Sequence, residues 1–134
     1  PYLTNLTKEK VEEELTKTDD LIFKLTGETT ELLRPPYLAT SATMFENCNR
    51  ICIGGYCPED WNGYSANLCF QKIRRNCGDG HVILLHDTTS ICQELARLVI
   101  DYYKACGYEF VTVSEMFEIK EVTPLKNYMY NSIQ

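Results

Sequence analysis

Apolar residues at helical spacing alternate with short apolar runs along almost the whole chain, and this alternation limits the possible folds most strongly. The helical spacing predicts helices at 8–26, 40–49, 66–77 and 90–106, and a short one after Ser114. The short apolar runs predict strands at 32–33, 51–57, 81–85 and 108–113. Strands separated by helices pair in parallel, because a helical crossover returns the chain to the same end of the sheet. The sequence therefore predicts an α/β fold with a largely parallel sheet.

The ends of these elements carry recognisable signals. Thr7 and Ser65 are placed to cap helices, and Ser114 is expected to cap the last one. Gly27 and Gly107 follow helical segments at the position where a left-handed residue ends a helix. In the helix at 90–106 the residues expected to point inward are Ile91, Leu95, Leu98, Tyr102 and Cys106.

The number of repeating units bears on the size of the native fold. About four strand–helix units are visible, roughly half of the eight that close a (β/α) barrel. Half a barrel would leave unpaired strand edges and an exposed core, so we expect the native molecule to extend further at its N-terminus. Residues 121–134 show no periodicity and are expected to wrap over the surface.

Charge and hydropathy exclude two classes of partner. The chain has 13 basic and 19 acidic residues, which gives a formal net charge of −6. A surface of that sign repels phosphate backbones, so nucleic acid is not expected as a partner. The longest aliphatic run, 82–85, is far shorter than the roughly 18 to 20 residues that a membrane-spanning helix needs. We therefore expect no transmembrane segment. The protein is also expected to be a monomer.

Cysteine is abundant for a chain of this length, with seven residues: Cys48, Cys52, Cys57, Cys69, Cys77, Cys92 and Cys106. This content predicts an oxidising compartment with some disulfides, and the odd count leaves one thiol unpaired. A disulfide between Cys48 and Cys52, across a helix-to-strand turn, is geometrically possible. No cysteine pair has zinc-finger spacing, so we expect no structural zinc site. The sequon Asn5-Leu6-Thr7 adds support for a secreted glycoprotein.

Polar residues follow three of the predicted strands at the point where each strand ends. These segments are Arg34-Pro35-Pro36-Tyr37, Asp60-Trp61 and Leu84-Leu85-His86-Asp87. In a parallel α/β sheet the carboxyl ends of the strands and the loops that follow them form the active face. The sequence therefore predicts that an arginine, an aspartate, a tryptophan and a histidine meet in one polar pocket.

In their order and spacing these three segments resemble the later motifs of the polysaccharide deacetylase family, which is carbohydrate esterase family 4 or the NodB homology domain. Residues 107–116 are similar to the closing strand of that family, and residues 1–7 resemble the segment after its His-x-x-x-His-Pro metal motif. The resemblance implies the C-terminal part of a distorted (β/α) barrel. It assigns residues 1–120 to the deacetylase domain and residues 121–134 to a C-terminal tail.

The same resemblance implies a function. The expected protein is a hydrolase that removes acetyl groups from N-acetylglucosamine polymers such as chitin, and it is secreted or associated with a cell wall. In this family a divalent metal, commonly zinc, is held by one aspartate and two histidines, and its bound water attacks the acetyl carbonyl. The resemblance places these ligands and the aspartate base upstream of Pro1, so no metal ligand is predicted within this chain.

Residues of the chain itself take the remaining roles by resemblance. His86 is expected to be the general acid that protonates the leaving amine, and Asp60 to hydrogen-bond to it and favour its protonated form. The family motif carries another aspartate three residues before the Asp-Trp pair, where this sequence has Cys57. That difference could alter the shell of residues that holds the loop.

Four other residues are expected to contact the reacting groups. The resemblance implies that Arg34 pairs with the base and that the backbone N–H of Tyr37 helps to stabilise the oxyanion. Trp61 and Leu84 are expected to wall the acetyl pocket.

Three alternatives remain open. The protein could be a catalytically silent carbohydrate-binding or wall-associated member of the same fold, or an acetylxylan esterase, with peptidoglycan as a further substrate. A domain that scaffolds protein partners would require the three motifs to be coincidental.

The other histidine, His81, lies five residues before His86, on the opposite face of the same predicted strand, and is interpreted as structural.

Overall fold

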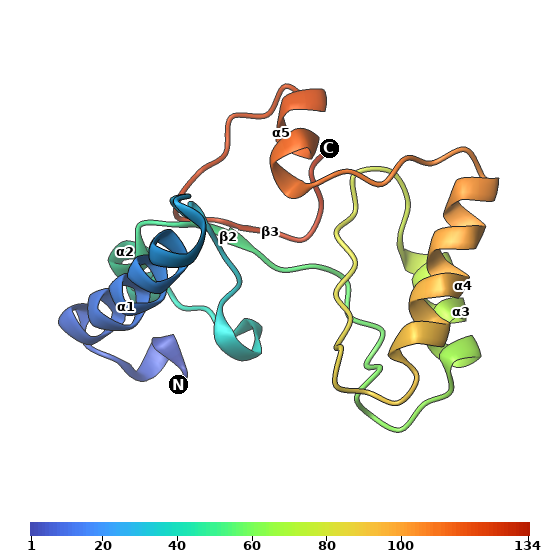
Figure 1. Cartoon of the computed structure of the whole chain (residues 1–134), viewed down its shortest axis with the longest axis horizontal. Coiled ribbons are helices and arrows are strands. Elements are labelled where there is room, and N and C mark those ends of the chain that lie inside the picture. The colour runs from blue at the N-terminus through green and yellow to red at the C-terminus, as the bar shows by residue number, and fades with distance from the viewer. The chain divides into compact units, whose positions relative to one another are not determined.

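The computed structural model describes all 134 residues, which form two compact units. Unit 1 comprises Pro1–Gly54 and Pro124–Tyr130, and unit 2 comprises Gly55–Thr123 and Asn131–Gln134. The regular elements, drawn in Figure 1, are η1 (Leu3–Asn5), α1 (Lys8–Thr26), β1 (Leu32–Leu33), η2 (Pro36–Leu38), α2 (Ala42–Cys48), β2 (Ile51–Ile53), α3 (Ala66–Asn76), α4 (Cys92–Ala105), α5 (Val113–Ile119) and β3 (Met129–Tyr130). None of the helices is long and apolar enough to cross a membrane.

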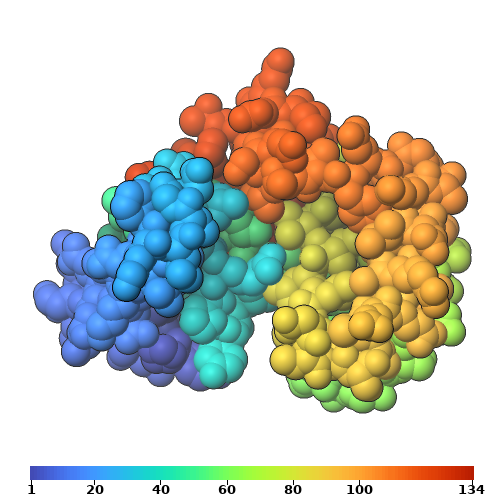
Figure 2. Space-filling view, in the orientation of Figure 1, coloured from blue at the N-terminus to red at the C-terminus, as the bar shows by residue number.

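In unit 1, α1 begins and ends where the sequence predicts, whereas α2 is shorter than the predicted helix at 40–49. Helix α1 follows Thr7 and stops at Gly27, which takes the left-handed conformation with φ 77°. Helix α2 starts after Ser41, whose side chain accepts a hydrogen bond from the backbone N–H of Met44. The buried core residues of this unit are Leu3, Val11, Met44, Cys48 and Cys52. Much of α1 lies outside this core, and its side chains form a large part of the blue surface in Figure 2.

The three strands of unit 1 form a parallel sheet in the order β1-β2-β3. The α/β class and the parallel pairing predicted from the sequence are thus confirmed. The expectation that residues 121–134 only wrap the surface is wrong, because Met129–Tyr130 pairs with β2 and Ile133 is 1% exposed. Strand β2 is buried along its whole length and needs hydrogen-bond partners on both edges, and β3 supplies the second edge.

In unit 2 the helices α3 and α4 pack side by side, as Figure 1 shows. Ser65 caps α3 as predicted, because its hydroxyl accepts from the N–H of Leu68. The buried residues of this core are Ala66, Cys69, Phe70, Ile73, Leu95, Val99 and Tyr103. The predicted inward face of α4 is wrong in part, since Cys106 is exposed and Val99 and Tyr103 are buried instead. Contact with α3 selects the stripe Leu95, Val99, Tyr103, whose members are four residues apart.

Three of the predicted strands are reduced or absent. The strand predicted at 51–57 extends only over Ile51–Ile53. Residues 81–85 make only isolated bridges, from Ile83 to Tyr56 and from His81 to Ser132. Residues 108–112 form no strand, and the cap of α5 is Thr112 rather than the predicted Ser114. Thr112 and Glu115 form a reciprocal capping box, which starts the helix at Val113 and leaves Ser114 inside its first turn.

Candidate functional site

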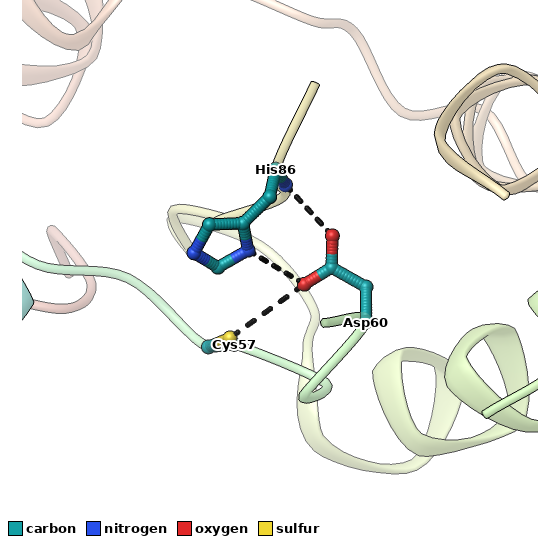
Figure 3. A group of neighbouring side chains, drawn as sticks. All are labelled: Cys57, Asp60 and His86. Atoms are coloured by element: carbon teal, nitrogen blue, oxygen red, sulfur yellow. Dashed lines mark hydrogen bonds and ion pairs between the residues drawn. The ribbon is translucent and has the colours of Figure 1, made fainter. Parts of the chain in front are cut away.

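The site is centred on a buried aspartate and a half-exposed histidine in unit 2, shown in Figure 3. One carboxylate oxygen of Asp60 accepts from the backbone N–H of His86 at 2.7 Å, and the other lies 2.8 Å from Nδ1 of the His86 ring. The side chain of Asp60 has no exposed surface, whereas that of His86 is 40% exposed. The buried acid therefore fixes both the backbone and the ring of His86.

The protonation pattern of the ring follows from these contacts. An ionised carboxylate can only accept hydrogen bonds, so Nδ1 of His86 carries a proton that it donates to Asp60. The other ring nitrogen, Nε2, points away from Asp60 (Figure 3). It can give a proton to a bound molecule when the ring is cationic and accept one when the ring is neutral. The pair therefore has the geometry of a general acid–base held by a buried carboxylate.

Backbone pairing brings the two loops of this site together. The N–H of Tyr56 donates to the carbonyl of Val82 at 2.8 Å, and the N–H of Leu84 donates to the carbonyl of Tyr56 at 3.0 Å. Gly55 makes this approach possible, because a Cβ on it would lie 3.0 Å from the carbonyl oxygen of Val82. The chain continues from Tyr56 towards Asp60 and from Leu84 towards His86, which places the two side chains opposite each other.

The loop that carries Asp60 is held by helix α3. The ammonium group of Lys72 donates to the carbonyl of Pro58 at 3.2 Å and pairs with the carboxylate of Glu59 at 2.6 Å. Glu59 adopts the left-handed conformation, with φ 62°. This turn directs Asp60 inward, while the hydroxyl of Thr89 binds the carbonyl of His86 from the other side.

Cys57 is the third member of the cluster. Its Sγ donates towards the Oδ1 atom of Asp60 at 3.9 Å, so this oxygen has both His86 and Cys57 as partners (Figure 3). Potential ligand atoms of Cys57, Asp60 and His86 all lie within 4.8 Å of one another. From the sequence we identified Cys57 only as a departure from the family motif and did not assign it to the site. Its three-residue spacing from Asp60 was the signal for this contact.

The remaining residues predicted for the site are distributed over both units. Arg34 and Tyr37 belong to unit 1, where the Arg34 guanidinium donates to the carbonyl of Gly54 at 3.2 Å. In unit 2, Trp61 is 61% exposed and Leu84 is buried. The structure thus brings Asp60 and His86 together as predicted, and the pocket roles of Trp61 and Leu84 stay predictions.

Tyr37 has an unusual backbone. It takes the left-handed conformation with φ 59°, which a non-glycine residue rarely adopts, and its ring stacks on Tyr2 with 4.2 Å between the ring centres. The two residues after it use their N–H groups to close the turn onto Pro35 and Pro36.

The metal set implied by the resemblance does not fit the residues of this chain. That set needs one aspartate and two histidines, but the cluster of potential ligands contains one histidine together with Cys57. The other histidine, His81, accepts on Nδ1 from the backbone N–H of Gly78 at 3.2 Å, which agrees with its structural interpretation. The cluster of Cys57, Asp60 and His86 therefore does not supply that ligand set.

Comparison with known proteins gives a consistent family. The model of the family described as "Polysaccharide deacetylase" matches residues 1–51. A bifunctional xylanase/deacetylase of Pseudobutyrivibrio xylanivorans is 33% identical over 94% of this chain and 21% of its own length. A peptidoglycan-N-acetylmuramic acid deacetylase of Bacillus subtilis is 29% identical over 90% of this chain and 26% of its own length. The chain therefore spans about a quarter or less of these two curated relatives.

Solved structures agree with the fold. The Xyl-CE4 domain of a multidomain xylanase from the hindgut metagenome of Trinervitermes trinervoides superposes with a TM-score of 0.91 at 31% identity, over 99% of this chain and 67% of that domain. A family 4 acetyl xylan esterase of Clostridium thermocellum, in complex with a cobalt ion, gives a TM-score of 0.89 at 32% identity, over 96% of this chain and 66% of that one. The chain therefore has the fold of a large part of the distorted barrel that these enzymes share.

Proposed function

The chain belongs to the polysaccharide deacetylase family, carbohydrate esterase family 4, and we propose that it acts in the hydrolytic removal of acetyl groups from a polysaccharide. The observation that carries this proposal is the pair of hydrogen bonds that Asp60 accepts from the backbone N–H and the ring of His86. A buried carboxylate that binds Nδ1 leaves Nε2 as the only nitrogen able to exchange protons with a substrate. This arrangement suits a general acid that protonates a departing amine or alcohol.

Asp60 has two tasks in this proposal. The carboxylate accepts a hydrogen bond from the proton on Nδ1 of His86, so that the other ring nitrogen, Nε2, is the one that meets the leaving group. The hydrogen bond that it accepts from the backbone N–H of His86 holds the loop, and the contact with Nδ1 keeps the ring from turning away from the reacting bond. After the leaving group has taken the proton from Nε2, solvent can reprotonate the ring through its exposed side.

Arg34 and Tyr37 are proposed to act on the other groups of the reaction. The strained turn at Tyr37 presents a backbone N–H that could donate to the oxyanion of the tetrahedral intermediate. Arg34 would pair with the carboxylate base, and its hydrogen bond to the carbonyl of Gly54 holds the guanidinium group in position. Trp61 and Leu84 are proposed as walls of the acetyl pocket.

The substrate is proposed to be a β-linked polysaccharide with acetyl groups. A chitin-like polymer of N-acetylglucosamine is the substrate expected from the sequence resemblance. Acetylxylan is the second candidate, because the Clostridium thermocellum relative is described as an acetyl xylan esterase. The Bacillus subtilis relative is described as acting on peptidoglycan. Each of these polymers lies outside the cytoplasm of the cell that digests or remodels it, which favours a secreted or wall-associated protein.

A divalent metal is part of the proposal through the family alone. One related structure holds a cobalt ion, and zinc is the ion expected from the resemblance. Because the residues of this chain do not provide the aspartate and two histidines of that site, we assign them only the proton transfer and the binding of the acetyl group.

Acetate release tests the proposal directly. The protein is incubated with chitin oligomers, peptidoglycan and acetylxylan, with and without a chelator, and His86→Ala is the matched inactive variant. Activity on at least one polymer that depends on His86 supports the proposal. Polysaccharide binding without acetate release from any of them would instead identify a silent carbohydrate-binding member of the fold.

A further inference from the structure

We propose that Cys57, Asp60 and His86 form a second, inhibitory binding site for a thiophilic divalent cation, and that zinc is the principal ion that it binds. This site differs in composition from the aspartate and two histidines of the family's catalytic metal, because one of its ligands is a thiolate. The binding site itself stands on the geometry of the cluster. Its inhibitory effect rests on the proposed role of His86 as general acid.

The distances suit a small cation. Oδ1 of Asp60 lies 2.8 Å from Nδ1 of His86 and 3.9 Å from Sγ of Cys57, and the three ligand atoms are all within 4.8 Å of one another. Neighbouring ligand atoms of tetrahedral zinc lie roughly 3.3 to 3.8 Å apart, as follows from Zn–N and Zn–O bonds near 2.1 Å and Zn–S bonds near 2.3 Å. The three side chains therefore need to move apart or together by only about 1 Å to accept the ion.

The ligand types favour zinc over magnesium or calcium. A thiolate and an imidazole are ligands that zinc, cobalt and cadmium accept, whereas magnesium and calcium prefer oxygen alone. The deprotonated thiol and the carboxylate together carry two negative charges, which neutralise a divalent cation in this partly buried place. The exposed side of His86 leaves room for a water molecule as the fourth ligand.

Two of the three ligands are already held in position. Asp60 keeps its second carboxylate oxygen on the backbone N–H of His86 at 2.7 Å, so Oδ1 can turn to an ion without loss of that bond. Cys57 directly follows Tyr56, whose N–H and carbonyl are both bonded to residues 82–84. Hydrogen bonds that orient metal ligands in this way raise the affinity of a site.

Occupation of the site would stop proton transfer. The ion replaces the proton on Nδ1 of His86 and occupies the oxygen of Asp60 that this proton now contacts. A ring with zinc on Nδ1 no longer forms the imidazolium that serves as the acid, because the positive charge is supplied by the metal instead. Excess zinc should therefore lower the rate of acetate release, while the ion of the family's own site remains bound.

Cobalt distinguishes the two kinds of site by spectroscopy. We propose titration of the intact protein with Co²⁺ and measurement of the thiolate-to-cobalt charge-transfer absorption, which a site of carboxylate and imidazole ligands cannot produce. The band should appear in the parent and in Cys106→Ser, whose exposed thiol lies outside the cluster and serves as the matched control. It should be absent in Cys57→Ser, which keeps a small hydrogen-bond donor near Asp60.

Zinc titration gives the corresponding affinity. Cys57→Ser should weaken the inhibitory binding of zinc by more than the roughly 10- to 100-fold that the loss of an outer-shell partner costs. It should also relieve inhibition by excess zinc, measured for each variant as the ratio of acetate release with and without added zinc. A cobalt band that persists in Cys57→Ser, or no band in the parent, overturns the proposed site.

The two proposals fail in different ways. If the parent shows the Cys57-dependent band but releases no acetate from any polymer, the cation site stands and the proposed function fails. If acetate is released and excess zinc neither inhibits it nor gives a Cys57-dependent signal, the proposed function stands and the cation site fails.

Discussion

Substitution of the acid and of its carboxylate partner should lower activity by different amounts. His86→Ala removes the proposed proton donor, and loss of a general acid usually costs about 10²- to 10⁴-fold in turnover. Asp60→Asn retains His86 but removes the charge from the atom that lies 2.8 Å from Nδ1. A hydrogen bond to a charged group contributes about 1.5–3 kcal/mol, which corresponds to roughly 10- to 150-fold in rate. We therefore expect Asp60→Asn to be impaired, but less than His86→Ala.

The structure explains why the asparagine variant keeps part of the activity. Its amide oxygen can still accept from the backbone N–H of His86, as the carboxylate does at 2.7 Å. Its amide nitrogen then faces Nδ1 and can only donate, so the ring must carry its proton on Nε2 and stays neutral. The ring is thus correctly placed but stabilised in the wrong form for acid catalysis.

Acetate release from the preferred polymer measures both variants, and an aryl acetate separates the role of His86 from a loss of folding. A nitrophenolate leaving group departs without protonation, so the deficit of His86→Ala should shrink on that substrate. Without excess zinc, the metal content of His86→Ala should match that of the parent. An equal deficit on both substrates would refute the role of His86 as acid, and a larger deficit in Asp60→Asn than in His86→Ala would refute the ranking.

Three further predictions concern stability and are measured by urea unfolding. Tyr103→Phe should lower the unfolding free energy by about 1 kcal/mol, because the hydroxyl donates at 2.9 Å to a carbonyl at the end of α3; an unchanged value would contradict this. Burial alone would raise the pKa of Asp19, but hydrogen bonds from Thr30 and Arg50 hold it below its ordinary value of 3.8. Asp19→Asn should therefore cost about 1 kcal/mol at neutral pH, and the difference from the parent should disappear as the pH falls through the lowered pKa; a constant difference would exclude this linkage. Gly80→Ala should destabilise most, because the added Cβ would lie 2.0 Å from a backbone oxygen of the C-terminal segment and φ is 72°; normal stability would show that this segment can move away.

Interactions between residues close in sequence were predicted well. The end of α1 follows from Gly27 and the start of α3 from Ser65, because capping groups lie within four residues of the backbone atoms that they satisfy. Thr7 occupies the N-cap position of α1 as predicted, but its side chain makes no capping hydrogen bond. The start of α5 was predicted at the wrong residue. Ser114 and Thr112 are both capable of capping, and the reciprocal bond with Glu115 favours Thr112.

Pairing between distant segments was predicted only in part. The sequence of residues 121–134 contains no signal for a strand, since Met129–Tyr130 is too short for any periodicity to appear. The buried face of α4 also depended on its neighbour, because several apolar stripes on that helix were available and α3 covers one of them. Strand pairing and the buried face of a helix depend on the neighbouring elements in the folded chain, so they cannot be predicted from the sequence of one segment alone.

The sequence alone was enough to predict the α/β class, the family, and that Asp60 and His86 belong to one site, because these inferences depend on the order and spacing of motifs such as those containing Arg34, Asp60 and His86. The role of His86 as the acid stays a prediction. Only the tertiary structure decided that Asp60 binds both the backbone and the ring of His86, across 26 positions of sequence, and that Cys57 joins them. Side-chain chemistry is a property of each residue. Contacts of about 3 to 4 Å between side chains on two loops form only when backbone pairing, here of Tyr56 with Val82 and Leu84, fixes the position of both loops.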